Sequence, residues 1–211
     1  MCKHPEYQQN LLDELVSQIV NPHRSQNGDA GKEQKLSDLN VLGMINYENY
    51  SDLSLYSNCF NEVLRMMPPV FYSSSVTMSE NLTAGNLKIR KGDVMTINMG
   101  RLQNLPCEWQ EPEKFIPDRF DQKSKYFLTP SGKRRNTYSF SPFLGGQRIC
   151  IGKSFIEVVS KLTVPSLLSK FEFDFKEGVD RQNIPYMWNN MIMTHAPDFK
   201  ARISRRNTVL N

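Results

Sequence analysis

The sequence has few residues of the kinds that build a metal cluster or a disulfide framework. Its 211 residues include only four cysteines and three histidines, and no two cysteines form a Cys-x-x-Cys pair. The histidines lie far apart, and no His-Glu-x-x-His motif occurs. These absences exclude the ligand spacings of known zinc sites, so we expect the cysteines to be reduced thiols.

Long apolar runs and a strong charge imbalance are also missing. No hydrophobic segment approaches the roughly twenty residues of a membrane-spanning helix, and the N-terminal MCKHPEYQQN is too polar for a signal peptide. The net charge is only +4, and the short clusters KIRK, GKRRN and ISRRN lack the motif context of a nucleic-acid surface. We therefore expect a chain that is itself soluble and intracellular and that binds no nucleic acid.

The spacing of apolar residues predicts three helices. Residues 6–20 and 51–67 each carry a stripe of apolar side chains at helical spacing, and a proline pair ends the second helix. A third helix is expected over 152–170, interrupted or kinked near Pro165.

The segments between these helices predict short strands and loops. Strands are expected near 76–78, 87–89 and 94–98, and at FEFDF and MIMTH in the C-terminal tail. The polar, turn-rich residues 21–44 predict a flexible linker. The fold class that results is mixed α+β, mainly α with small β-sheets.

The stretch FSPFLGGQRICIGKSFIEVV, residues 140–159, combines glycines, one cysteine and the start of a predicted helix. Its Gly-Lys-Ser triplet at 152–154 resembles a phosphate-binding loop, which would also require a glycine at position 147. That position is Gln147, and the nearest glycine, Gly146, stands one residue too early. Backbone N–H groups in this register would miss the phosphate oxygens, so the sequence argues against phosphate binding.

Cys150 lies just before the predicted helix, where unpaired N–H groups and the helix dipole favour a thiolate. A thiolate there can be a nucleophile, a redox sensor or a metal ligand, and a purely structural cysteine is the ordinary alternative. The sequence nominates no base for a nucleophile. The neighbouring glycines, apolar side chains and Arg148 suit a flat apolar ring that carries carboxylates and an axial metal, which describes haem.

The pattern Phe143-x-x-Gly146-x-Arg148-x-Cys150-x-Gly152 resembles the haem-binding loop of the cytochrome P450 family at every fixed position. The resemblance implies that the cofactor is haem b and that Cys150 is the axial ligand of its iron. It also implies that Arg148 contacts a haem propionate, while Phe143, Gly146 and Gly152 shape the pocket.

Two further stretches resemble that family in the same order. NEVLRMMPPV is similar to its Glu-x-x-Arg helix, with Glu62 and Arg65 on one helix face. CEWQEPEKFIPDRF is similar to its proline-arginine meander, with Arg119. The resemblance implies a buried structural triad of Glu62, Arg65 and Arg119 that braces the haem loop. A weak surface salt bridge is the alternative for the helical pair.

The resemblance covers about residues 2–204 and implies a single partial domain over 1–211, the C-terminal half of the cytochrome P450 fold. The helix that activates oxygen in the family does not occur in this sequence, so no catalytic residue is expected here. Membrane association would come only through an N-terminal anchor that this sequence lacks; full-length relatives are often in the endoplasmic-reticulum membrane.

The activity that the resemblance implies is monooxygenation. An apolar organic substrate would be oxidised with O₂ and with electrons from a reductase or ferredoxin. Two alternatives stay open: a non-catalytic haem-binding protein, and an inactive truncated fragment.

Several other positions match places of interest in the family. Five side chains fall where family members contact substrate: Phe71, Tyr72, Met187, Trp188 and Met191. Ordinary core packing is the alternative for them. Ser75 stands where many members carry an arginine that reaches a propionate. A basic face that docks an acidic electron donor would comprise Lys133, Arg134, Arg135, Lys153 and Lys161. The alternative is that these side chains are simply solvated surface charges.

Overall fold

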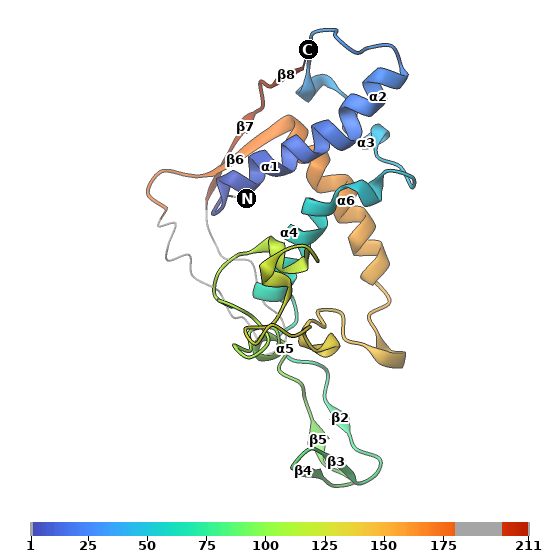
Figure 1. The fold of residues 1–211 in the computed structure, drawn as a ribbon, viewed down its shortest axis with the longest axis vertical. Helices are drawn as coiled ribbons and strands as arrows, with labels where there is room; N and C mark the ends of the chain where they lie inside the picture. The colour runs from blue at the N-terminus through green and yellow to red at the C-terminus, as the bar shows by residue number, and fades with distance from the viewer. Residues whose placement is uncertain (1, 180–199, 211) are drawn as a thin grey trace. The chain divides into compact units, whose positions relative to one another are not determined.

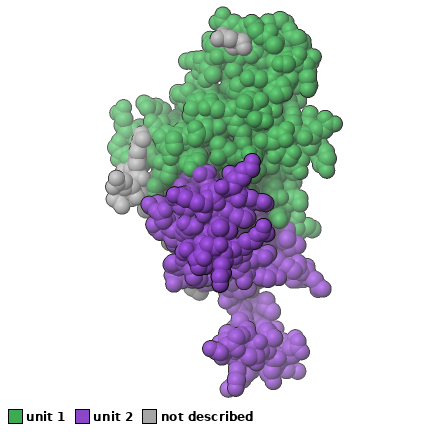
Figure 2. Space-filling model, in the orientation of Figure 1, with its two compact units in different colours: residues 1–60, 151–185, 197–211 green, residues 61–150, 186–196 purple. Residues whose placement is uncertain are grey.

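The structure is a computed structural model that describes residues 2–179 and 200–210. The chain divides into two compact units (Figure 2). The first unit comprises Met1–Phe60, Ile151–Pro185 and Pro197–Asn211, and the second comprises Asn61–Cys150 and Tyr186–Ala196. The sequence predicts one partial domain, and each unit has a buried core of its own.

The first unit begins with a continuous helical segment (Figure 1). α1 (Pro5–Leu15) continues through a π-helical turn, η1 (Val16–Val20), into α2 (Asn21–Gln26). The predicted helix over 6–20 is therefore confirmed, and the helical segment continues as far as Gln26. Its apolar stripe forms the core of this unit through Leu11, Leu12, Leu15, Ile19 and Val20, all of which are buried.

The segment predicted as a flexible linker, 21–44, carries regular structure. After α2, β1 (Gln34–Lys35) pairs antiparallel with β8 (Val209–Leu210), and η2 (Leu36–Asp38) and α3 (Val41–Met44) follow. Leu36 and Val41 have no exposed surface. The polar residues do form turns, but the apolar residues between them are buried in the unit's core, and composition alone did not reveal this.

The C-terminal part of the first unit confirms two predicted elements and modifies one of them. α6 (Lys153–Lys170) runs unbroken through Pro165, although proline cannot donate the helical hydrogen bond to the carbonyl one turn earlier. The predicted strand FEFDF is β6 (Phe171–Phe175), which pairs antiparallel with β7 (Ala201–Arg205). MIMTH lies outside the described residues.

Side chains of α1 hold two other elements of the first unit in place. The amide of Gln8 donates to the carbonyl of Phe173 at 3.1 Å and accepts from its N–H at 2.8 Å, as a neighbouring strand would. The carboxylate of Glu14 accepts from the N–H groups of Leu55 at 2.6 Å and Tyr56 at 2.9 Å. Glu14 therefore caps the N-terminus of α4 (Ser54–Met66), the second predicted helix, in place of a local capping residue.

The second unit contains the end of α4, two nested β-pairs and a long segment of short turns. β2 (Val76–Thr77) pairs with β5 (Val94–Met95), and between them β3 (Leu82–Ala84) pairs with β4 (Leu87–Ile89). The predicted strands are confirmed. Gly85 and Gly92 have φ of 59° and 89°, which is the left-handed conformation that these turns need.

The rest of this unit is helical turns separated by loops. The ranges are α5 (Met99–Leu102), η4 (Pro117–Phe120), η5 (Lys125–Phe127), η6 (Thr137–Ser139) and η7 (Gly146–Arg148). Among the described residues every sheet is a two-stranded antiparallel pair. The predicted class, mainly α with small β-sheets, is therefore confirmed.

Gly100, in α5, is required by close packing. A Cβ atom at this position would lie 1.9 Å from Cε1 of Phe71. We expect Gly100→Ala to lower the free energy of unfolding by about 1–3 kcal/mol, because the ring must be displaced. Gly145→Ala is the matched control, since its Cβ would meet Tyr138 only at 3.6 Å, an ordinary contact. Urea unfolding of both variants measures the difference, and equal midpoints would contradict the packing argument.

Candidate functional site

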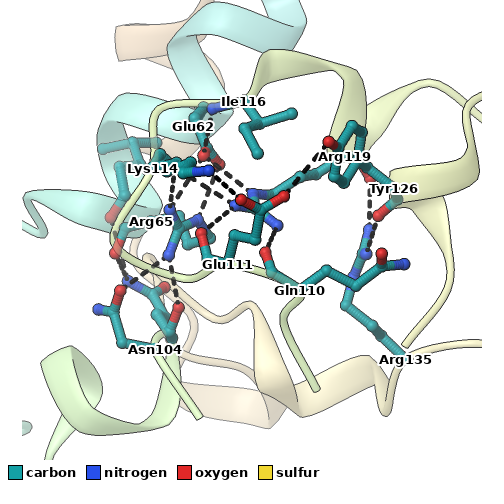
Figure 3. A network of polar contacts seen from close by, with 12 residues as sticks. Glu62, Arg65, Asn104, Gln110, Glu111, Lys114, Ile116, Arg119, Tyr126 and Arg135 are labelled. Atoms are coloured by element: carbon teal, nitrogen blue, oxygen red, sulfur yellow. Dashed lines mark hydrogen bonds and ion pairs between the residues drawn. The ribbon is translucent and has the colours of Figure 1, made fainter. Parts of the chain in front are cut away.

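Three charged side chains meet in the interior of the second unit (Figure 3). Glu62, Arg65 and Arg119 have no exposed surface. α4 places Glu62 and Arg65 one turn apart, and Nε of Arg65 donates to Oε2 of Glu62 at 2.7 Å. A second guanidinium nitrogen of Arg65 reaches Oε1 at 2.9 Å, and Nε of Arg119 donates to the same oxygen at 3.0 Å. The structure thus brings the three residues together around one carboxylate.

The meander and the residues just before it supply the remaining partners of this network. Arg65 donates to the side chain of Asn104 at 2.8 Å, and Arg119 donates to the carbonyl of Glu111 at 2.6 Å. The N–H of Ile116 donates to Glu62 at 2.9 Å. Burial lowers the pKa of Arg119, while the charge of Glu62 opposes that shift. Carbonyl dipoles therefore help one carboxylate to stabilise two buried guanidinium groups.

Removal of the carboxylate charge tests this network. Glu62→Gln would leave two buried arginines without a counter-charge, and breaking a buried pair in this way costs about 3–5 kcal/mol. We expect the urea midpoint to fall accordingly. Glu113→Gln, on the exposed part of the same meander, should leave the midpoint nearly unchanged. Equal effects of the two substitutions would show that the buried charge does not hold the meander.

The predicted cofactor loop, from Phe143 to Cys150, closes on itself within the second unit. The N–H of Cys150 donates to the carbonyl of Phe143 at 2.9 Å. Leu144 and Gly146 have φ of 61° and 68°, so the chain turns sharply twice in the left-handed conformation. This conformation is strained for Leu144, and a residue held in it is a feature of functional loops. The closing hydrogen bond sets where the cysteine lies relative to the start of the loop.

The Cys150 thiol is free and exposed to solvent. The side chains of Leu144, Arg148 and Ile149 are exposed around it in the sequence, and Ile151 is fully exposed. A Cβ atom added at Gly146 would meet nothing within 4 Å. An accessible thiol, exposed apolar side chains and open space above a glycine are the features that an apolar planar ring needs. The residues present therefore fit a haem.

The remaining loop residue is Gly152, in the first unit, which is the N-cap of α6 and follows Cys150 by two positions. Its carbonyl accepts from the N–H of Ile156 at 3.0 Å, which begins the helical hydrogen bonding. The prediction that Cys150 just precedes a helix is thereby confirmed. The unpaired N–H groups of a helix start favour a negatively charged group close to them in the chain.

Two predicted substrate contacts can be placed, and one of them is a packing residue. The ring of Phe71 packs against Gly100, and its carbonyl accepts from Met99 at 2.8 Å. Tyr72 is exposed and forms an isolated β-bridge with Asn98. The other three candidates, Met187, Trp188 and Met191, lie outside the described residues. The hydroxyl of Ser75 is exposed and lies 3.1 Å from that of Thr96.

The predicted basic face loses two of its five members. Lys133, Arg134 and Lys153 are exposed as a docking surface requires. Arg135 instead points into the second unit, where it donates to the carbonyl of Tyr126 at 2.8 Å. Lys161, in the first unit, donates to the carbonyl of Tyr50 at 3.3 Å, and burial lowers the pKa of its ammonium group. Both side chains belong to the packing of their own units, because carbonyl and aromatic partners lie within their reach.

Sequence reasoning missed the residues that surround the triad. Gln103 and Trp109 are almost completely buried, and the amide of Gln103 donates to the carbonyl of Leu64 at 3.0 Å. Trp109 lies under the guanidinium of Arg65, at 5.3 Å from the ring centroid. A tryptophan inside a segment that otherwise looks like an exposed, proline-rich loop is the signal that could have identified this core.

The described residues contain neither a membrane-spanning helix nor a cluster of metal-binding side chains. In the ranges 2–179 and 200–210 there is no helix that combines the length and the apolar character needed to cross a membrane. Over the same ranges, no group of three or more histidine, cysteine, aspartate or glutamate side chains is arranged to hold a metal ion. A haem iron needs no such group, because the porphyrin supplies its in-plane ligands and the protein can supply one axial thiolate.

A glycine-containing loop that ends in a free, exposed cysteine, together with a buried Glu-Arg-Arg network, is the combination of features expected of the haem-thiolate class. The comparisons with known proteins agree: the family model described as "Cytochrome P450" matches residues 1–203. The chain belongs to the cytochrome P450 family. Haem is the cofactor of that family, and its members include monooxygenases.

Individual relatives are similar at low identity. The chain is 28% identical to cytochrome P450 94B3 of Arabidopsis thaliana over 84% of its own length and 34% of the relative's. It is 30% identical to human cytochrome P450 3A7 over 77% of its length and 31% of the relative's. It is 23% identical to cytochrome P450 monooxygenase LUC2 of a Fusarium species over 98% of its length and 35% of the relative's. The chain thus spans about a third of the length of these relatives.

Proposed function

We propose that this chain carries the part of a haem-thiolate monooxygenase that binds the proximal side of haem b. The observation that carries the proposal is the exposed, free thiol of Cys150 at the end of a self-closed loop, in a chain of the cytochrome P450 family. A thiol that is structural is usually buried, and one in a disulfide has a partner. This thiol is accessible to a large ligand.

Each residue of the loop has a role in the proposed site. Cys150 would hold the iron through its sulfur, and Arg148 would pair with a propionate carboxylate. Phe143 provides apolar surface, while Gly146 and Gly152 let the backbone approach the ring closely. When bound, the haem supplies the iron centre for oxygen chemistry, and its thiolate ligand increases the electron density on that iron.

Glu62, Arg65 and Arg119 have a structural role in this proposal. Their side chains are completely buried in the second unit, and their charged groups are paired with one another. They cannot meet a substrate without unfolding the meander. They hold the meander against α4. The segment that leads to Cys150 follows the meander in the chain.

The activity of the whole protein is oxidation of an apolar organic substrate with O₂ and with electrons from a redox partner. Family membership supports this proposal. Because the chain spans only about a third of its relatives' length, the proposed activity is that of the whole protein. No residue of this chain is assigned to oxygen activation. The substrate-binding role remains proposed only for Tyr72 and for the candidates at 187–191.

A second candidate is a haem-binding protein without oxygenase activity. Exposed apolar side chains near the loop in the sequence favour it, and they include Ile151, Phe155, Ile156 and Val158. If nothing covered them, water would reach a haem bound there and would quench oxygen chemistry. An inactive fragment that binds no haem is the remaining alternative.

Haem reconstitution with a carbon monoxide difference spectrum distinguishes these possibilities. We expect the reduced, haem-loaded chain to show the red-shifted Soret band typical of thiolate ligation, because Cys150 donates its sulfur to the iron. Cys150→Ala should lose that band completely, whereas Cys107→Ala, at another exposed cysteine, should retain it. Failure of the wild-type chain to take up haem would refute both haem-binding proposals. Haem uptake by this chain, without substrate turnover by the whole protein that contains it, would support the second candidate.

The exposed cations of the predicted docking face generate a prediction about electron transfer. Charge reversal of Lys133 and Arg134 should slow reduction of the haem-loaded protein by an acidic ferredoxin about tenfold at low salt, because electrostatic steering is lost. The same reversal at Lys88 and Lys91, exposed on the β-hairpins, is the control. Stopped-flow reduction at two ionic strengths measures the effect. Equal rates for both double variants would refute donor docking at this face.

A further inference from the structure

Arg135 is half-buried among aromatic rings and carbonyl groups of the second unit. Its guanidinium carbon lies 4.5 Å from the ring centroid of Trp109 and 5.5 Å from that of Phe127. One terminal nitrogen donates to the carbonyl of Tyr126 at 2.8 Å, and the other donates to the carbonyl of Arg119. The flat guanidinium can therefore stack on rings and donate in its own plane at the same time.

These contacts attach Arg135 directly to the buried triad. Arg119, whose carbonyl accepts from Arg135, donates its own Nε to Glu62 at 3.0 Å. Trp109 is the second connection, because its ring also lies 5.3 Å from the guanidinium carbon of Arg65. The ring of Trp109 therefore contacts both cations and connects them through packing. The triad and Arg135 form one continuous arrangement (Figure 3).

The chain that follows Arg135 leads straight to the cysteine loop and is held at both ends. At the next residue, the N–H of Asn136 donates to the carboxylate of Glu108 at 2.8 Å. A few residues later the ring of Phe140 returns to the same cluster, 6.3 Å from Trp109 and 4.8 Å from Phe120. The loop that ends at Cys150 begins three positions after Phe140.

We propose that Arg135 is a positioning residue that anchors the segment leading to the Phe143–Cys150 loop onto the Glu62–Arg65–Arg119 network. It acts through two connections, the carbonyl of Arg119 and the ring of Trp109. The consequence for the thiolate rests on the proposed function. The order of the loop does not, because it can be measured in the haem-free chain.

The alternative for Arg135 is general packing of the second unit. Exposure of the ring of Trp109 would then destabilise the whole unit, and the loop would suffer no more than the rest. A positioning role predicts a local effect, which is largest between residues 140 and 150. The two roles therefore differ in where the structure loosens.

Hydrogen exchange of the haem-free chain separates the two roles. We expect Arg135→Ala to accelerate exchange of the Cys150 amide, which donates to Phe143, by about tenfold relative to wild type. Exchange in α5, which lies in the same unit, should change much less. Arg135→Lys keeps the charge but loses the planar fork, so it should give a smaller acceleration in the same place.

Arg134→Ala is the matched control. Arg134 is the adjacent arginine, its side chain is exposed, and its β-bridge to Leu128 uses only the backbone. Its exchange pattern should match wild type. If Arg135→Ala accelerates the loop and α5 equally, or changes neither, the positioning role is refuted. If Arg135→Ala does not fold, the same comparison between loop and α5 is made with Arg135→Lys, and a uniform change there refutes the role.

A second measurement connects the loop to the thiolate. In the haem-loaded chain with carbon monoxide, Arg135→Ala should reduce the share of the red-shifted Soret band at unchanged haem content, and Arg135→Lys should restore part of it. An unaltered band would overturn the link to Cys150. Absence of haem uptake by the wild-type chain would refute the proposed function but would leave the exchange result to decide the role of Arg135.

Discussion

The carboxylate of Glu62 is the interaction on which the second unit depends. It lies in the interior, accepts from Arg65 and Arg119 and also from the backbone N–H of Ile116. Two guanidinium groups buried near one carboxylate are stable only if neighbouring dipoles compensate the excess positive charge. The carbonyls of the meander provide that compensation, so this irregular segment has a defined course although it contains little regular secondary structure.

The cysteine loop depends on this network through aromatic packing and hydrogen bonds. Trp109 lies at the centre, with Arg65 and Arg135 over its ring and with Phe120 and Phe140 beside it. The loop itself adds one closing hydrogen bond, from Cys150 to Phe143, and two left-handed residues. In the proposed site, the sulfur of Cys150 has to be fixed in position and accessible to the haem. A rigid base that leaves the thiol exposed meets that need.

Periodicity and motif spacing predicted much of the fold. The helices around residues 6–20 and 51–67 and the strands near 76–78, 87–89 and 94–98 were predicted and are confirmed, whereas β3 was not predicted. The helix after Cys150 was also predicted, but Pro165 does not interrupt it. The structure of residues 21–44 was not foreseen, because its burial depends on a few apolar residues, such as Leu36, among many turn formers. Local composition cannot indicate whether such residues find a partner.

The amino-acid sequence by itself determined the class of this protein, because the order and spacing of the Cys150 loop, the Glu62–Arg65 helix and the Arg119 meander together identify the cytochrome P450 family. Only the tertiary structure decided which charges face inward. Arg134 and Arg135 are adjacent and chemically identical, yet the first is exposed and the second stacks on Trp109. The reason is physical. A cation is buried only where carbonyl groups and aromatic rings from distant parts of the chain surround it, and the local sequence does not indicate where that occurs.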